Sequence, residues 1–98
     1  MPQELLDRNE IEAALAQLPG WALSRDGKSI RCQFKFASFV QAFGWMSQVA
    51  LMAEKLNHHP DWSNSYRRVQ VSLSTLDSGG VTALDFTLAR QMTALAAL

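Results

Sequence analysis

Both histidines of the chain fall within one short polar segment, residues 54–62. Glu54 precedes His58 by four residues, about one turn of a helix, so its carboxylate is expected beside that imidazole. An imidazole changes its charge near neutral pH, and a neighbouring carboxylate can orient the ring, so such a pair suits proton transfer. The segment is therefore the candidate active site, with Glu54, His58 and His59 as its candidate catalytic residues.

Other interpretations of the same segment stay open. The two histidines could instead hydrogen-bond exposed carbonyl groups at a helix end. The run His58-His59-Pro60-Asp61 offers metal ligands, but adjacent residues seldom turn toward one ion, and Cys32 is distant in the sequence. Gly79-Gly80 lacks the spacing and the lysine of a phosphate-binding loop, and no serine lies in a nucleophile-elbow motif.

The composition indicates a small globular protein. Its 98 residues, of 10.9 kDa, fit a single domain that spans residues 1–98. Nine basic and nine acidic side chains cancel, which argues against nucleic acid or anionic lipid as a partner. The longest strongly apolar stretch, residues 49–53, is far shorter than the ~20 residues that cross a bilayer, and no secretory signal opens the sequence. The single cysteine, Cys32, excludes an internal disulfide and fits a reducing compartment, so we expect a cytoplasmic protein without a membrane partner.

Periodicity in the first third of the chain predicts a helix and a β-hairpin. Asn9 is placed to cap the helix, with Glu12 as its capping-box partner. Apolar residues follow at helical spacing, namely Ile11, Ala14, Leu15 and Leu18. Residues 21–24 and 29–36 form the two strands, which turn at Asp26-Gly27. The second strand alternates apolar and polar side chains, as a strand with one solvated face does.

The longest predicted helix carries an unusually wide apolar surface. It begins after Ser38, with Gln41 as the capping-box partner, and ends near Asn57 or His58 because Pro60 cannot continue it. Its apolar residues cover more of the circumference than packing on one sheet requires: Phe39, Phe43, Trp45, Met46, Val49, Ala50, Met52, Ala53 and Leu56. We therefore expect a second partner for this helix, and a homodimer or homotetramer would supply it.

The remainder of the chain predicts two more strands and a last helix. Residues 61–66 and 67–75 are the strands, and the second alternates around an apolar face. Thr82 is expected to cap the helix, with Asp85 as its capping-box partner. The element order is α-β-β-α-β-β-α. We interpret this order as an α+β fold, a four-stranded antiparallel sheet with three helices packed on one face.

The candidate site also resembles the signature of a known family. The sequence Glu-x-x-x-His-His-Pro, followed by Trp, Tyr, Leu-Ser-Thr and a downstream Asp, resembles the pterin-4a-carbinolamine dehydratases. In this chain the matching residues are Glu54, His58-His59-Pro60, Trp62, Tyr66, Leu73-Ser74-Thr75 and Asp85. The resemblance extends from residues 18–21 to the carboxyl end, and the α-β-β-α-β-β-α order agrees with the fold of that family.

The resemblance implies a lyase that uses neither a metal nor an organic cofactor. Its substrate would be a 4a-hydroxytetrahydropterin, left by aromatic amino acid hydroxylases, which loses water to give the quinonoid dihydropterin. His58 would be the main acid and base, His59 would bind and orient the pterin, and Glu54 would set the charge of His58. The other residues implied at the pterin site are Asp61, Trp62, Ser74, Thr75, Leu76 and Asp85. Ser74 and Thr75 would act through their backbone, whereas Asp85 is equally expected as a helix cap.

One position departs from the family pattern. A third active-site histidine usually follows Ser-Thr directly, but Leu76 stands there, with the strand parity of the polar face. We therefore expect dehydration to be weakened or selective for one isomer of the substrate. The alternative is a dehydratase-like protein without catalysis that serves in binding or assembly or as a transcriptional cofactor. Proteins resembling this family have such roles, and an apolar Leu76 favours that alternative.

Overall fold

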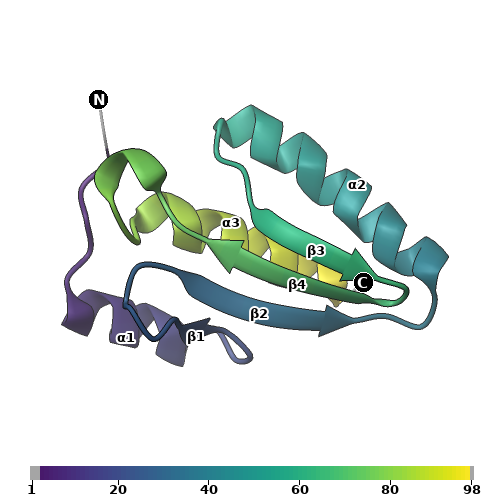
Figure 1. The fold of residues 1–98 in the computed structure, drawn as a ribbon, viewed down its shortest axis with the longest axis horizontal. Coiled ribbons are helices and arrows are strands. Elements are labelled where there is room, and N and C mark those ends of the chain that lie inside the picture. The colour runs from purple at the N-terminus through teal and green to yellow at the C-terminus, as the bar shows by residue number, and fades with distance from the viewer. Residues whose placement is uncertain (1–2, 98) are drawn as a thin grey trace.

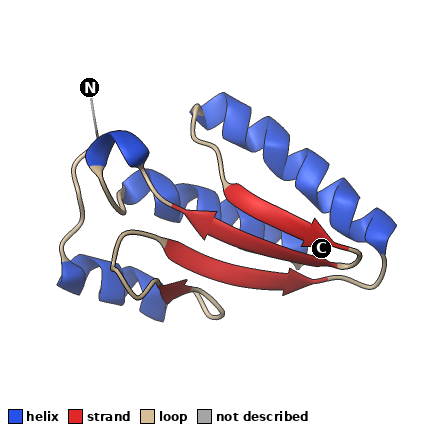
Figure 2. Ribbon diagram, in the orientation of Figure 1, coloured by secondary structure: helices blue, strands red, loops and turns tan. Residues whose placement is uncertain are grey.

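One antiparallel sheet and three α-helices make up the structure, a computed structural model that describes residues 3–97. The strands lie in the order β1-β2-β4-β3 (Figure 1, Figure 2). The predicted α+β class and element order are confirmed, with one added 3₁₀ turn, η1. The elements are α1 (Arg8–Ala16), β1 (Ala22–Leu23), β2 (Ile30–Lys35), α2 (Phe39–Leu56), β3 (Asp61–Ser65), β4 (Arg68–Leu73), η1 (Leu76–Ser78) and α3 (Ala83–Ala96).

The sheet has one apolar and one polar face, as the alternation predicts. The central strands β2 and β4 pair so that Ile30 faces Leu73 and Phe34 faces Val69. These side chains point toward the helices, and α3 lies behind the sheet in Figure 1. The opposite face of β2 and β4 carries exposed polar and charged side chains, Arg31, Gln33, Lys35, Arg68 and Gln70. The helices therefore cover one face only.

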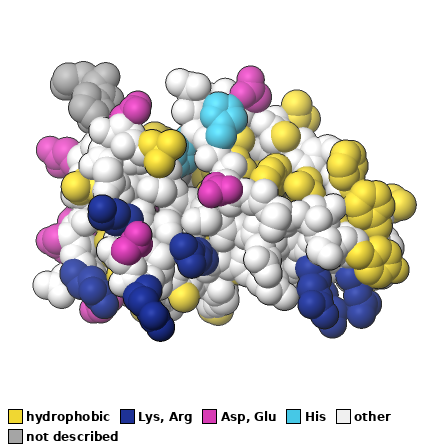
Figure 3. All heavy atoms as spheres, viewed as in Figure 1, with side chains coloured by type: hydrophobic (Ala, Val, Ile, Leu, Met, Phe, Trp, Pro, Cys, Tyr) yellow, Lys and Arg dark blue, Asp and Glu magenta, His cyan; other side chains and the backbone are white. Residues whose placement is uncertain are grey.

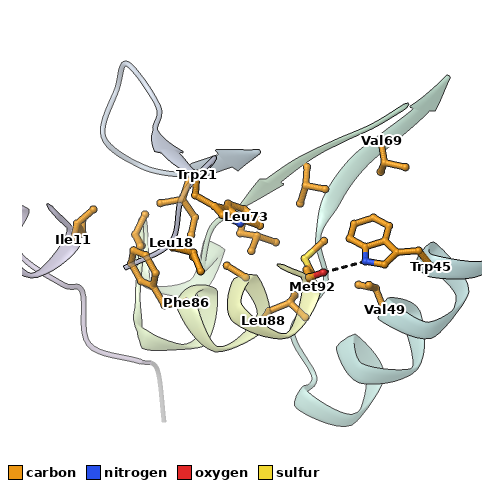
Figure 4. Packing of buried hydrophobic residues seen from close by; sticks show 14 of the residues in the cluster. Ile11, Leu18, Trp21, Trp45, Val49, Val69, Leu73, Phe86, Leu88 and Met92 are labelled. Carbon is orange, nitrogen blue, oxygen red and sulfur yellow. Dashed lines mark hydrogen bonds between the residues drawn. The ribbon is translucent and has the colours of Figure 1, made fainter. Parts of the chain in front are cut away.

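The core joins all three helices to the sheet through large apolar side chains. At one end, Ile11 of α1 lies with Leu18, Trp21 and Phe86 (Figure 4). At the other end, the indole Nε1 of Trp45 donates a hydrogen bond of 3.0 Å to the backbone oxygen of Met92, which fixes α2 against α3. None of the helices within residues 3–97 has the length and apolarity to span a membrane.

The cap of α1 differs from the sequence prediction. Asp7, not Asn9, is the capping residue: its Oδ1 accepts from the backbone N–H of Glu10 at 2.8 Å, and Glu10 Oε1 accepts from the N–H of Asp7 at 2.9 Å. Both pairs have the spacing of a capping box, so spacing alone does not choose between them. Glu12 instead forms an exposed ion pair of 3.2 Å with Arg8.

The cap of α2 matches the prediction in part. Ser38 Oγ accepts from the N–H of Gln41 at 3.1 Å, but Gln41 Oε1 accepts from Ala37 rather than from Ser38, so the capping box is incomplete. The wide apolar surface of α2 divides into two faces. Ala42, Trp45, Val49 and Ala53 are buried, whereas Phe39, Val40, Phe43 and Leu51 are exposed. In Figure 3, hydrophobic side chains accordingly gather over the amino-terminal half of α2.

Replacing Gly44 by alanine should stabilise the protein. Gly44 lies inside α2, and a Cβ built there meets no atom within 4 Å. Because alanine is about 1 kcal/mol more favourable than glycine within a helix, we expect Gly44→Ala to raise the free energy of unfolding by about that amount. Urea denaturation of both proteins measures the difference, and an unchanged or lower stability would contradict it. Gly20→Ala is the matched control: Gly20 has φ +93°, so alanine there should destabilise the protein.

Candidate active site

The carboxyl end of α2 buries one histidine and leaves the other exposed. Asn57 takes the left-handed conformation, with φ 52° and ψ 44°, which asparagine tolerates better than most residues. The N–H of His58 donates to the carbonyl of Ala53 at 3.0 Å, which closes the helix. His58 consequently turns inward and is only 8% exposed, whereas the side chain of His59 is 55% exposed.

His58 forms a hydrogen bond with a fully buried carboxylate. Its Nε2 lies 2.5 Å from Asp85 Oδ1, and Asp85, in the first turn of α3, is 0% exposed. The other oxygen, Asp85 Oδ2, accepts from Thr75 Oγ1 at 3.0 Å and from the N–H of Thr82 at 2.9 Å. A buried carboxylate is tolerated only where donors surround it, and here three different segments supply them.

The same network fixes which nitrogen of His58 carries a hydrogen. Thr82 Oγ1 accepts from the N–H of Leu84 at 3.3 Å, and its own hydrogen points to Thr75 Oγ1 at 2.7 Å, because the Thr75 hydroxyl already donates to Asp85. The hydroxyl of Thr75 and the N–H of Thr82 thus each donate a hydrogen bond to Asp85, and the Nε2–H of His58 is the remaining donor. Nδ1 is then the nitrogen that remains for a ligand.

Glu54 pairs with His59, which corrects the prediction that it lies beside His58. The distance between Glu54 Oε2 and His59 Nε2 is 2.5 Å. The predicted spacing of four residues assumes that the helix continues, but α2 ends at Leu56 and the left-handed Asn57 turns His58 away. Because the side chains of Glu54 and His59 are 76% and 55% exposed, this pair orients a surface imidazole and adds little stability.

A cleft of about 460 Å³ opens beside the histidines, within the usual size range of small-molecule sites. The structure brings five of the predicted site residues to its wall: His58, His59, Ser74, Thr75 and Leu76. Figure 3 shows the histidines and a neighbouring acidic side chain at the upper edge of that view. The lining also includes residues that sequence reasoning missed, among them Gln3 and Asp77.

Three residues predicted at the pterin site do not line the cleft: Asp61, Trp62 and Asp85. Trp62 packs against Trp45, with ring centroids 6.1 Å apart, because alternation along β3 turns its side chain toward the core. Asp61 is exposed and pairs with Ser72 at the start of β3. Asp85 fulfils the predicted capping role, since it forms a capping box with Thr82, and it is also the partner of His58.

Because position 76 is a leucine, the wall of the cleft that it lines carries no imidazole. Strand β4 ends at Leu73, and Leu76 begins η1, so strand parity no longer governs its direction. Its side chain is 88% exposed at the rim of the cleft. Both histidines therefore lie on the wall formed by the α2–β3 connection. Within residues 3–97, no group of three or more His, Cys, Asp or Glu side chains is arranged to hold a metal ion.

Comparison with known proteins agrees with this geometry. The family model described as pterin 4 alpha carbinolamine dehydratase matches residues 4–95. A protein of Rhizobium johnstonii is 58% identical over 99% of this chain and 96% of its own length, and one of Mesorhizobium japonicum is 54% identical over 94% of each chain. Both are provisionally named pterin-4-alpha-carbinolamine dehydratases.

Two solved structures share the fold. The crystal structure of a transcriptional coactivator/pterin dehydratase from Brucella melitensis is 48% identical and superposes with a TM-score of 0.91 over 93% of this chain and 97% of that one. A pterin dehydratase-like protein identified as a RuBisCO assembly factor in the alpha-carboxysome is 20% identical, with a TM-score of 0.68 over 79% and 89% of the two chains, which shows likeness of fold alone. With a family model across nearly its whole length and relatives above half identity, the chain belongs to the pterin-4-alpha-carbinolamine dehydratase family.

Proposed function

We propose that the protein is a hydro-lyase that dehydrates a 4a-hydroxytetrahydropterin to the quinonoid dihydropterin. The observation that carries this proposal is the buried His58–Asp85 hydrogen bond at the wall of the cleft. It holds one imidazole in a fixed direction with Nδ1 free, which is the arrangement that general acid–base catalysis requires. The family to which the chain belongs supports the choice of a pterin as substrate.

The reaction needs two proton movements at adjacent atoms. The protonated imidazole of His58 gives its Nδ1 hydrogen to the 4a hydroxyl group, the C4a–O bond breaks and water leaves. The N5 lone pair forms the C4a=N5 double bond. The neutral imidazole then accepts the proton from N5, so the catalyst returns to its starting state. The dehydration involves no net oxidation or reduction, so the step requires no redox cofactor.

The neighbouring residues would bind the flat bicycle. His59, held by Glu54, would orient the pterin from the same wall as His58, and Glu54 would thus act on His59 rather than on His58. Ser74 and Thr75, on the facing segment after β4, would meet the edge of the ring through their backbone. Asp85 would act as a positioning residue through His58, since it is fully buried.

Removal of the imidazole at position 58 should abolish most of the activity. We expect His58→Ala to lower kcat about 10²- to 10⁴-fold, and Asp85→Asn to lower it about 10²-fold because the ring loses its fixed orientation. The measurement is the rate of quinonoid dihydropterin formation from synthetic 4a-hydroxytetrahydropterin.

Two controls accompany this experiment. Glu12→Gln, at an exposed ion pair on α1, should leave the rate unchanged. Urea denaturation separates loss of chemistry from loss of folding, which matters for Asp85 because it also caps α3. A folded His58→Ala variant with the wild-type rate would refute the proposed role of His58.

Leu76 should make the dehydration slow or selective for one isomer at C4a. Without an imidazole on the second wall, the isomer whose hydroxyl group faces away from His58 lacks a proton donor. We expect Leu76→His to raise the rate for the slower isomer about tenfold or more, with little change for the faster one. The Leu76→Gln variant is the matched control, since it is polar but cannot transfer a proton at neutral pH. An equal rate for both isomers in the wild type, with no gain in Leu76→His, would contradict this expectation.

The alternative is a non-catalytic binding, assembly or transcriptional cofactor protein. The exposed Leu76 favours it, since an apolar side chain at the rim suits a protein contact. Titration calorimetry with a 7,8-dihydropterin separates the two functions. Because Trp62 is half-buried against the core and does not line the cleft, quenching of its fluorescence is a poor reporter of binding. Binding with a turnover rate above background supports the enzyme, and absence of binding supports the alternative.

We further propose that the exposed face of α2 forms a homodimer or homotetramer contact. Phe39, Val40, Phe43 and Leu51 are 44%, 77%, 56% and 74% exposed on that face. Large apolar side chains gathered in this way mark protein–protein contacts.

Charged substitutions on this face should dissociate the oligomer. Light scattering should give a dimer or tetramer for the wild type, and the double variant Phe43→Glu/Leu51→Glu should shift it to the monomer, since burial of unpaired charge is costly. Gln33→Glu, on the solvated face of the sheet, is the matched control and should keep the oligomer. A monomeric wild type at high concentration would contradict the proposal.

A further inference from the structure

The tip of the β3–β4 hairpin contains a residue in an unfavourable backbone conformation. Tyr66 has φ 55°, a left-handed conformation that glycine or asparagine adopts readily and a bulky residue does not. Asn64 Nδ2 donates to the carbonyls of Tyr66 and Arg68 at 3.0 and 2.9 Å, which fixes the turn. Because Tyr66 is 65% exposed, burial of its ring does not offset the strain. The hairpin therefore holds an aromatic ring in solvent at a cost in stability.

Beside this turn, two basic side chains face each other across neighbouring strands. Lys35, the last residue of β2, is paired in register with Arg68, the first residue of β4. Both are exposed on the solvated face of the sheet, and like charges directly opposite each other destabilise a sheet. Among the residues that the structure describes, neither side chain forms an ion pair that would relieve the repulsion. Two unfavourable features thus lie together at one end of the sheet, as is typical of functional sites.

The segments that build this end of the molecule contain no acidic residue. None of the nine falls within residues 27–53, which cover β2 and most of α2, or within residues 62–76, which cover the hairpin after its first residue. In Figure 3, basic and hydrophobic side chains accordingly gather at the end where β2 stops and α2 begins, and the acidic ones lie outside it. The charges of the chain cancel in sum but are separated in space. The basic and aromatic residues at this end form what we call the hairpin-tip surface: Lys35, Tyr66, Arg67 and Arg68.

We propose that the hairpin-tip surface binds an acidic peptide segment of a partner protein, one that carries an aromatic residue among its carboxylates. A carboxylate between Lys35 and Arg68 would replace their repulsion by two charge-assisted hydrogen bonds. The ring of Tyr66 offers a flat apolar contact whose backbone is already fixed, and tyrosine and arginine are the residues that dominate protein interfaces. None of the four residues lines the cleft beside the histidines, so this surface is separate from the candidate active site.

The observations favour a peptide over other anionic ligands. The surface is open, whereas a small molecule is usually held in a concave site. Its three basic side chains are fewer than the clusters of about four to eight that bind anionic lipids. Nucleic acid is also disfavoured, since the chain as a whole carries no net positive charge.

The test measures fluorescence anisotropy of a fluorescein-labelled peptide, Glu-Asp-Trp-Glu-Asp. We expect the wild type to bind it at least about tenfold more tightly than a peptide with lysine at each acidic position. Arg68→Glu should weaken binding about tenfold or more, yet leave stability in urea unchanged or higher, because it places opposite charges across the strands. Arg25→Glu is the matched control: it lies in the turn before β2, is equally exposed and changes the net charge by the same amount, and it should leave the affinity unchanged.

Tyr66→Gly separates binding from folding. It should lower the affinity for the acidic peptide about fivefold and should not lower the urea midpoint, because glycine adopts φ 55° without strain. A merely structural role of Tyr66 gives the reverse result, a loss of stability with unchanged affinity.

Three other results would also overturn the inference. The first is failure of the wild type to bind the acidic peptide, or equal affinity in Arg68→Glu. The second is preferential binding of a single-stranded oligothymidylate or of phosphatidylserine vesicles. The third is a change of oligomeric state in Arg68→Glu by light scattering, which would make this surface a contact between copies of the chain.

Discussion

The arrangement of the site depends on one buried negative charge, the carboxylate of Asp85. It has no solvent exposure, so the protein itself must supply the hydrogen bonds that water would otherwise give. Those donors come from the α2–β3 connection, from the segment after β4 and from the start of α3. Loss of the His58 donor would leave Oδ1 unsatisfied, which costs about 1–3 kcal/mol or more for a charged group, whereas Oδ2 has two donors. The carboxylate thereby ties together three segments that are distant in sequence.

The apolar alternation and the capping spacings in the sequence predict most of the fold and part of the hydrogen-bond network around Asp85. Alternation along residues 67–75 marks the buried face of β4, and the Thr82–Asp85 spacing predicts the cap of α3, because both signals are local. The His58 partner is a different case. A spacing of four residues favours Glu54, but a single left-handed residue, Asn57, breaks the helical geometry on which that spacing depends. The true partner is 27 residues away, and only the packing of α3 against α2 brings it near.

The cleft residues that the sequence did not predict are likewise brought to the site by contacts between segments that are distant in sequence. Gln3 lies in a segment with no periodicity, and its place at the cleft follows from hydrogen bonds to Ser78 and to the loop before α3. Trp62 shows the opposite case. It belongs to the family signature, yet the alternation of β3 turns it to the core beside Trp45. A signature therefore groups residues that bind a ligand with residues that shape the scaffold, and only the position of each side chain relative to the cleft separates them.

The packing of α2 on α3 links the core to the chemistry of the site. Trp45 is anchored to the backbone of Met92, His58 follows the end of α2 by two residues, and Asp85 lies in the first turn of α3. The hydrogen bond between His58 and Asp85 thus depends on how α2 packs against α3, which the buried side chains of both helices determine. Because interiors are close-packed, we expect a substitution in the α2–α3 contact to displace the imidazole even where it does not line the cleft. The exposed face of α2 lies on the opposite side of the same helix from the residues that it buries.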